Sequence, residues 1–335
     1  MEFVDRRNKE KVKLSDMAVK LGLELIGNGE REIIGIASPE YPAPGRVCVI
    51  WDKSAIKKLP SETAIIGKAE YFAPGRDGLI SPTPRESLPM VAALFPAHSG
   101  LRPQRGVSPL AFVSPDAVVS PEASVSPFAF IGPGCYVGDM SVICPNATLV
   151  HDVRIGKGCI IHSGAVLGAD GFGFERTPSG VVKIPQTGGV MIGDDVEIGA
   201  CATVDCGTLD DTVIGSGTKI DNQVQIGHNA KIGRNCIICS MSGIAGSSVI
   251  EDNVTISVQA GVTDHVRIGA NTIIGGRAGV THDIPPDSII SGFPARNHND
   301  AKRALVLATD LPLIVKRLRI LEREVEELRR ETASR

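Results

Sequence analysis

The stretch that decides the fold is residues 214–250, IGSGTKIDNQVQIGHNAKIGRNCIICSMSGIAGSSVI, in which isoleucine recurs at every sixth position. The same period continues to Val280, and it also runs from Val113 to Leu167 before it breaks. A helix repeats every 3.6 residues and an amphipathic strand every two, so neither explains a period of six. The pattern predicts a parallel β-helix in which each hexapeptide forms one flat face, three faces close a coil, and coils stack.

A second series of small or β-branched residues stands four positions after these aliphatic residues. One large and one small inward side chain per hexapeptide is what a triangular coil needs, because the small one sits where two walls converge. Cys135, Cys159, Cys236 and Thr208 all fall in this small position. We therefore interpret the three cysteines as core residues. The other five cysteines have no partner pattern, so we expect no metal site among them.

The repeat breaks twice, and both breaks are candidates for function. After Leu167 the period is interrupted by residues 168–191, and it slips again, by four positions, before Ile214. The first insertion carries Phe172 and Phe174 in a chain with only 4% aromatic residues. An insertion in an otherwise regular solenoid often forms a binding loop. The alternative is a packing clip against a neighbouring subunit.

The composition excludes several classes of protein. The 335 residues carry a net charge of −3 and no basic run, which argues against a nucleic-acid binder. No apolar run is long enough to span a membrane, and the charged N-terminus lacks the apolar core of a signal peptide. We therefore expect a cytoplasmic protein with reduced thiols.

The repeat is flanked by two different segments. Residues 1–106 alternate helical and short apolar stretches with Pro/Gly turns, which predicts a small α/β domain with helices near 14–21 and 87–94. The β-helix is expected over 107–295. Residues 296–335 carry a heptad seam, with Asp310 as a candidate cap and Pro312 in the first turn. We expect this helix to dock between subunits; the alternative is a helix packed on its own chain.

Two histidines of the repeat are candidates for catalysis. His228 is the third residue of its hexapeptide and points outward, with Asp221 and Gln225 nearby, and His265 follows two coils later. Two coils correspond to about 10 Å. A histidine titrates near neutral pH and suits a general base, while a developing oxyanion needs a nearby backbone N–H. The alternative is that these outward histidines are only solvated; His282 follows on the same side.

Several longer segments are more specific than the six-residue period. They are residues 168–174 with 183–186, then 192–200, 206–215 and 220–229. With the flanking segments, they make the chain resemble the UDP-3-O-(3-hydroxyacyl)glucosamine N-acyltransferases of lipid A synthesis in Gram-negative bacteria. The known hexapeptide-repeat β-helices are left-handed, so the resemblance implies a left-handed parallel β-helix.

The resemblance also implies roles for individual residues. The family's general base falls on His228, its backbone oxyanion donor on Gly246 and its second histidine on His265. Asp221 and Gln225 would contact the acyl 3-hydroxyl region. The substrate-binding set further includes Asn229, Phe172 and Phe174. The acyl donor would be acyl carrier protein, delivered in a cleft between two subunits of a homotrimer, and no metal or redox cofactor is implied.

The chain departs from the family pattern in two places. The segment that holds uracil in the family aligns with residues 47–59, where the expected aromatic is missing and Trp51 could supply stacking from a shifted position. In residues 276–282, small Gly279 replaces bulky residues that limit acyl length in some relatives, and Arg277 or His282 could meet the acidic carrier protein.

Two other functions remain open at this point. One is a related hexapeptide acyltransferase, acting on UDP-N-acetylglucosamine or another nucleotide-sugar, or using coenzyme A. The other is a non-enzymatic trimeric scaffold on a β-helix stalk. A fold alone does not establish activity.

Overall fold

The computed structural model describes residues 11–95, 105–293 and 298–333. The chain divides into two compact units, residues 1–102 and 103–335. Each unit has its own core, so each is described by itself. Among the described residues, no helix is long and apolar enough to cross a membrane.

The first unit is a small α/β domain, as the sequence predicts. Its central sheet has the order β2-β7-β6-β5-β4, in which β4 to β7 pair in parallel and β2 pairs antiparallel with β7. Leu14 and Met17 of the first helix are completely buried against it. The elements are β1 (Val12–Lys13), α1 (Leu14–Leu21), β2 (Glu24–Ile26), β3 (Glu32–Ile33), β4 (Gly35–Ala37), β5 (Arg46–Val49), η1 (Lys53–Lys58), β6 (Ala64–Gly67), η2 (Ala69–Tyr71), β7 (Gly78–Ile80) and α2 (Pro84–Ala93).

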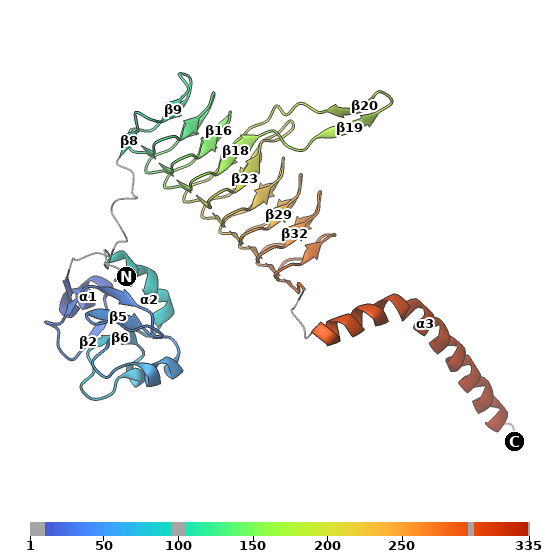
Figure 1. Cartoon of the computed structure of the whole chain (residues 1–335), viewed down its shortest axis with the longest axis horizontal. Helices are drawn as coiled ribbons and strands as arrows, with labels where there is room; N and C mark the ends of the chain where they lie inside the picture. Colours follow the sequence, from blue (N-terminus) through green and yellow to red (C-terminus); the bar gives the residue numbers. More distant parts are fainter. Residues whose placement is uncertain (1–10, 96–104, 294–297, 334–335) are drawn as a thin grey trace. The chain divides into compact units, whose positions relative to one another are not determined.

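The second unit contains the predicted parallel β-helix, whose short strands stack into three sheets (Figure 1). Each strand pairs in parallel with the strand one coil away, as Val118 does with Tyr136, three hexapeptides further along. Three hexapeptides therefore make one coil. The periodic aliphatic side chains form one continuous core, which also holds Cys135, Cys159 and Cys236, as predicted.

The three sheets share the coils between them, one strand from each coil. The eight-stranded sheet contains β10 (Val118–Val119), β13 (Tyr136–Val137), β16 (Val153–Ile155), β21 (Val190–Ile192), β24 (Thr212–Ile214), β27 (Lys231–Ile232), β30 (Val249–Ile250) and β33 (Arg267–Ile268). The nine-stranded sheet contains β9 (Phe112–Val113), β12 (Phe130–Ile131), β15 (Thr148–Leu149), β18 (Val166–Ala169), β23 (Thr203–Asp205), β26 (Gln225–Ile226), β29 (Gly243–Ile244), β32 (Gly261–Val262) and β35 (Gly279–Val280). The ten-stranded sheet contains β8 (Gly106–Val107), β11 (Ser124–Val125), β14 (Val142–Ile143), β17 (Ile160–Ile161), β22 (Glu197–Ile198), β25 (Lys219–Ile220), β28 (Ile237–Ile238), β31 (Thr255–Ile256), β34 (Ile273–Ile274) and β36 (Ile289–Ile290).

The two breaks in the repeat are loops at one corner of the prism. Val153 pairs with Val190, although a regular coil would bring it to a partner only three hexapeptides away, so a long insertion leaves the coil between them. Val190 pairs with Thr212, slightly beyond the regular spacing, so a short insertion leaves on the next coil. The longer loop contains an antiparallel hairpin of β19 (Phe174–Thr177) and β20 (Gly180–Lys183), which extends from the β-helix (Figure 1).

One prediction for the inward core series is wrong. Thr208 is predicted in the small inward position, but it is only half-buried, and the position is filled by Thr212, which is fully buried. The reason is the short loop, which comes before the small position of this hexapeptide and moves it along the chain. Thr208 is thereby free to take part in the functional site.

The C-terminal helix is longer than the sequence suggests. Helix α3 (His298–Ala333) runs through both Asp310 and Pro312, so the prediction that Asp310 caps its start is wrong. A proline inside a helix removes one backbone hydrogen bond and bends the helix rather than always ending it. The heptad side chains are exposed along α3: Leu307, Leu311, Ile314, Leu318, Leu321, Val325 and Leu328.

The alternation within one strand predicts a sharp contrast in stability. Ile238 is completely buried in the β-helix, whereas its neighbour Ile237 is 50% exposed. Ile238→Ala should lower the free energy of unfolding by about 2–5 kcal/mol, because it leaves a cavity in a close-packed core. Ile237→Ala should cost about 0.5 kcal/mol. Denaturant unfolding of the two variants checks this, and equal losses would contradict the assigned register.

Candidate active site

His228 lies at the prism corner that carries both insertions. It follows β26 by two residues. In the nine-stranded sheet β26 pairs with β23, and β23 pairs with β18. The longer loop leaves after β18 and the shorter one after β23, so the three corners stack on successive coils. Backbone hydrogen bonds join the loops to each other, including Thr187 N–H to the Thr208 carbonyl at 2.9 Å. Both loops therefore reach the histidine from the same side of the β-helix.

Two glycines pack directly against His228. A Cβ atom added at Gly171, in the longer loop, would lie 2.5 Å from the His228 Cβ. One added at Gly246, on the next coil, would lie 2.7 Å from Nε2 of the ring. Only residues without a side chain permit so close an approach. The ring is therefore held between a loop and a coil.

The hydrogen bonds around His228 determine which ring nitrogen carries the proton. Nδ1 lies 3.0 Å from Oδ1 of Asn229 and 3.3 Å from Oγ1 of Thr208. The Asn229 amide cannot be turned round, because its Oδ1 also accepts from Thr208 N–H and its Nδ2 donates to the Asp210 carbonyl. The Thr208 hydroxyl donates to Oε1 of Gln186. Both neighbours of Nδ1 are thus acceptors, so Nδ1 is the protonated nitrogen and Nε2 keeps its lone pair.

His228 lines a cavity of ≈410 Å³ that gathers five of the predicted site residues, including all three predicted catalytic ones. Gln225, His228, Gly246, His265 and Phe172 all line it. The backbone N–H of His265 donates to the Gly246 carbonyl at 3.2 Å, which brings the two histidine-bearing corners together across one intervening coil. The structure therefore unites residues from the loop and from three coils.

Gly246 offers the cavity an unused donor. The neighbouring N–H groups of Ala245 and Ser247 donate to the carbonyls of Val262 and His228. The N–H of Gly246 donates to no group within residues 105–293, the described part of the β-helix. An unused N–H beside a histidine Nε2 is suited to bind a developing negative charge.

Asp205 lines the same cavity, although the sequence analysis did not predict it as a site residue. Burial raises the pKa of its carboxyl, and the Gln225 amide hydrogen bond at 2.9 Å and the nearby His228 partly oppose this. Asp264 and the half-buried Thr208 were missed as well. One feature of the sequence could have indicated Asp205 and Thr208. Both lie between Val204 and Ile214, where the six-residue period slips for the second time.

The remaining predicted residues lie elsewhere. Asp221 is predicted beside His228, but within one chain it lies in a different sheet and lines another cavity, with His162 and Glu197. The reason is that each hexapeptide turns the chain onto a new face of the prism. Asp221 accepts hydrogen bonds from the backbone of Asn222 and Ser240.

The other residues predicted to contact the substrate or the carrier protein are exposed. Phe172 is 86% exposed and forms an edge-to-face pair with Phe174, their ring centres 5.0 Å apart. Trp51, 49% exposed, belongs to the first unit. Arg277 and His282 are exposed on the last coils, where Arg277 donates to the Gln259 side chain.

Known proteins resemble this chain both in sequence and in fold. The bacterial transferase hexapeptide family (six repeats) matches residues 134–169 and 211–246. The UDP-3-O-acylglucosamine N-acyltransferase of Hahella chejuensis is 40% identical over 92% of this chain and 94% of its own length. The protein of the same name from Methylorubrum populi is 52% identical over 45% of this chain, a match that spans 42% of that relative. Among solved structures, the UDP-N-acetylglucosamine acyltransferase of Francisella novicida superposes with a TM-score of 0.52 at 27% identity, over 59% of this chain and 73% of that one.

The raised pKa of Asp205 predicts a pH-dependent gain in stability on its replacement. A carboxyl whose pKa is higher in the folded than in the unfolded state favours folding below the unfolded pKa, and this contribution is lost as the pH rises through the folded pKa. Asp205→Asn should therefore raise the thermal unfolding midpoint near neutral pH, with the difference fading in acid. Asp264→Asn is the matched control for removing one charge. A gain that persists in acid would contradict the assignment.

Proposed function

The chain belongs to the UDP-3-O-acylglucosamine N-acyltransferase family, and from that premise we propose that it moves a 3-hydroxyacyl group from acyl carrier protein to the 2-amine of UDP-3-O-(3-hydroxyacyl)glucosamine. One observation carries the proposal. His228, whose Nε2 is unprotonated, and Gly246, whose N–H is unused, line the same cavity. Acyl transfer to an amine needs these two groups, a base and an oxyanion donor, side by side.

The proposed reaction uses the two groups in sequence. The acceptor nitrogen attacks the thioester carbonyl while Nε2 of His228 takes its proton. The carbonyl oxygen becomes negatively charged and accepts a hydrogen bond from Gly246 N–H. The intermediate then collapses: the new C–N bond is kept and the C–S bond breaks. The imidazolium returns its proton to the departing thiolate. Asn229 stabilises the imidazolium, because its Oδ1 accepts from Nδ1 throughout. The chemistry needs no redox cofactor.

The charges of the cavity favour an amine as the acceptor. Asp205 and Asp264 both line it, and neither forms an ion pair with a lysine or arginine of the described chain. A sugar amine carries a positive charge until it loses its proton, and a carboxylate attracts that charge. Gln225 holds Asp205 through a 2.9 Å hydrogen bond, which fixes the carboxylate in the cavity.

The proposal extends to partners and surroundings. The exposed heptad side chains of α3 and the exposed Phe172 are apolar surfaces that a homotrimer would cover. A trimer would also bring Asp221 of one chain toward the His228 cavity of the next. Arg277 and His282 are proposed to contact the acidic carrier protein. Trp51 is proposed to contact the uracil ring. The reaction is proposed to take place in the cytoplasm.

Replacing the proposed base should slow acyl transfer strongly. His228→Ala should lower the rate of acyl transfer from 3-hydroxyacyl carrier protein by about 10²–10⁴-fold, because it removes the proton acceptor. The assay follows product from UDP-3-O-acylglucosamine, with UDP-N-acetylglucosamine as a competing acceptor in parallel. The variant must retain the wild-type circular dichroism and oligomer size. Transfer that survives the substitution would reject the mechanism, and wild-type transfer only to UDP-N-acetylglucosamine would reject the substrate.

A pair of glycines on one coil tests the oxyanion site. Gly246→Ala should reduce kcat by about 10²-fold or more, because its methyl group would collide with His228 Nε2 and displace the ring from the donor. Gly243→Ala adds the same group where nothing lies within 4 Å, so transfer should stay within a few-fold of wild type. Equal losses in the two variants would show that the close approach at Gly246 is not used.

A further inference from the structure

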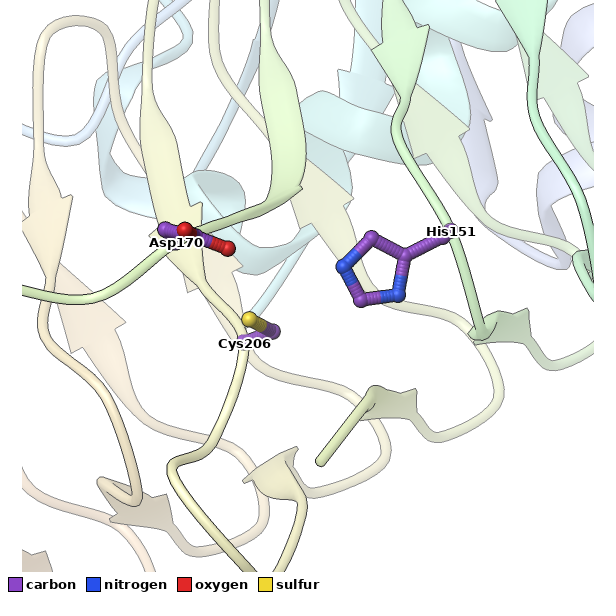
Figure 2. A group of neighbouring side chains, drawn as sticks. All are labelled: His151, Asp170 and Cys206. Carbon is purple, nitrogen blue, oxygen red and sulfur yellow. The ribbon is translucent and has the colours of Figure 1, made fainter. Parts of the chain in front are cut away.

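The corner that carries His228 gathers a second group of chemically active side chains on the preceding coils. His151 follows β15, Asp170 follows β18 and Cys206 follows β23. Each offers one atom able to bind a metal, and these three atoms lie within 4.8 Å of one another (Figure 2). The side chains come from three successive strands of the nine-stranded sheet, so the stacking of coils brings them together.

A β-bulge aligns Asp170 with this group. The pairing of β18 with β23 shifts between Leu167 and Ala169, so that Ala169 pairs with Asp205 and Asp170 comes level with Cys206. Gly168 forms the bulge with a φ of +84°. A Cβ atom there would lie 3.1 Å from the His151 carbonyl oxygen and 2.8 Å from a Val153 methyl group. Glycine is therefore required both for the backbone conformation and for the approach to His151.

Cys206 differs from the other buried cysteines of the β-helix. Cys135, Cys159 and Cys236 occupy the small inward position, and each thiol lies near a backbone carbonyl that can accept its hydrogen. Cys206 stands at the corner instead and is completely buried. In the described part of the chain, the Cys206 thiol donates no hydrogen bond, so its sulfur is not occupied by a backbone acceptor. Burial raises the pKa of this thiol, and the nearby Asp170 and Asp205 carboxylates raise it further, so a cation would displace the thiol proton on binding.

His151 is oriented as a metal-binding histidine would be. Its Nδ1 lies 3.2 Å from Oδ2 of Asp152, so the carboxylate holds the proton on that nitrogen. The opposite ring nitrogen, Nε2, is turned toward Asp170 and Cys206 (Figure 2). Histidines that bind metals usually donate their second nitrogen to a carboxylate in this manner. The Asp170 carboxylate is held in turn by Lys183 through Oδ2, which leaves Oδ1 for a cation.

We propose that His151, Asp170 and Cys206 bind a divalent cation of the zinc class. One sulfur, one imidazole nitrogen and one carboxylate oxygen form a ligand set that zinc and cobalt accept and that magnesium and calcium do not. Three protein ligands leave a fourth position for water. In a tetrahedral zinc site the ligand atoms stand about 3.3–3.8 Å apart, so no pair would need to close by more than about 1.5 Å on binding. Asp170, at the exposed start of the loop, can supply that movement.

The position of the group gives a bound cation a structural consequence. Asp170 directly precedes Gly171, which packs against His228. A cation bound by Asp170 would tie the start of the loop to the coils on which His151 and Cys206 stand. It would thereby support the catalytic histidine without touching the substrate. The group has no short sequence motif, because its ligands are far apart in sequence but adjacent in the stacked coils.

Cobalt binding to the full-length, metal-stripped chain tests the proposal without any substrate. Titration with Co²⁺ should show one ion per chain, with a thiolate-to-metal charge-transfer band and the visible bands of a tetrahedral site, and Zn²⁺ should displace it. Zn²⁺ should also raise the thermal unfolding midpoint. Cys206→Ser should remove the charge-transfer band, and Asp170→Asn, at an exposed position, should weaken binding by about tenfold or more.

The matched control is Cys201→Ser, which alters an exposed thiol outside the group and should leave the band and the affinity unchanged. If Cys206→Ser fails to fold, Asp170→Asn and His151→Gln still test the site through the same titration. The proposal is overturned if the wild type shows no charge-transfer band, if the band survives Cys206→Ser, or if binding requires millimolar metal. None of these outcomes depends on acyl transfer.

Discussion

Parallel backbone pairing between successive coils is the constraint on which the rest of the molecule depends. Each short strand hydrogen-bonds to the strands one coil before and one coil after it, and the inward isoleucines interlock along one core. A coil in this stack cannot hold an extra residue without losing its register. Extra residues must therefore leave at a corner, where the chain turns and the backbone is free to face solvent. The site exists because a long insertion and then a short one leave at one corner on consecutive coils.

The same stacking explains how a site forms from residues that are distant in sequence. Residues at equal positions of successive coils stand in a column at the spacing of β-strands, about 4.8 Å. At this corner the column runs from His151 through Cys206 to His228 and Gly246. The two loops cover part of it, exclude water from Cys206 and bring acceptors to Nδ1 of His228. The proposed metal-binding group and the proposed catalytic base thus lie along one edge of the prism and share the loops that cover it.

Stability and function compete at this edge. Asp205 is held in a partly dry cavity where its pKa is raised, which costs folding free energy at neutral pH. Gly171 and Gly246 lose more backbone entropy on folding than residues with side chains would. In return, they allow close contact with the imidazole ring. These are the positions where the regular hexapeptide pattern is broken or left without a side chain, which is typical of functional sites in an otherwise consistent fold.

The sequence by itself determined the β-helix, its register, the cysteines of its core and the place of both loops, because the six-residue period is repeated and every inward position is subject to the same packing demand. The spacing also predicted His228 and His265 as site residues, and the family resemblance added Gly246; all three line one cavity. Only the tertiary structure decided that Thr208 leaves the core, that Asp205 joins the cavity, that Asp221 lies on another face and that α3 begins before Asp310. These depend on where the loops fold back and which face each coil presents, and neither is encoded in local periodicity. The tautomer of His228 likewise follows from hydrogen bonds between residues of three coils, which no single segment contains.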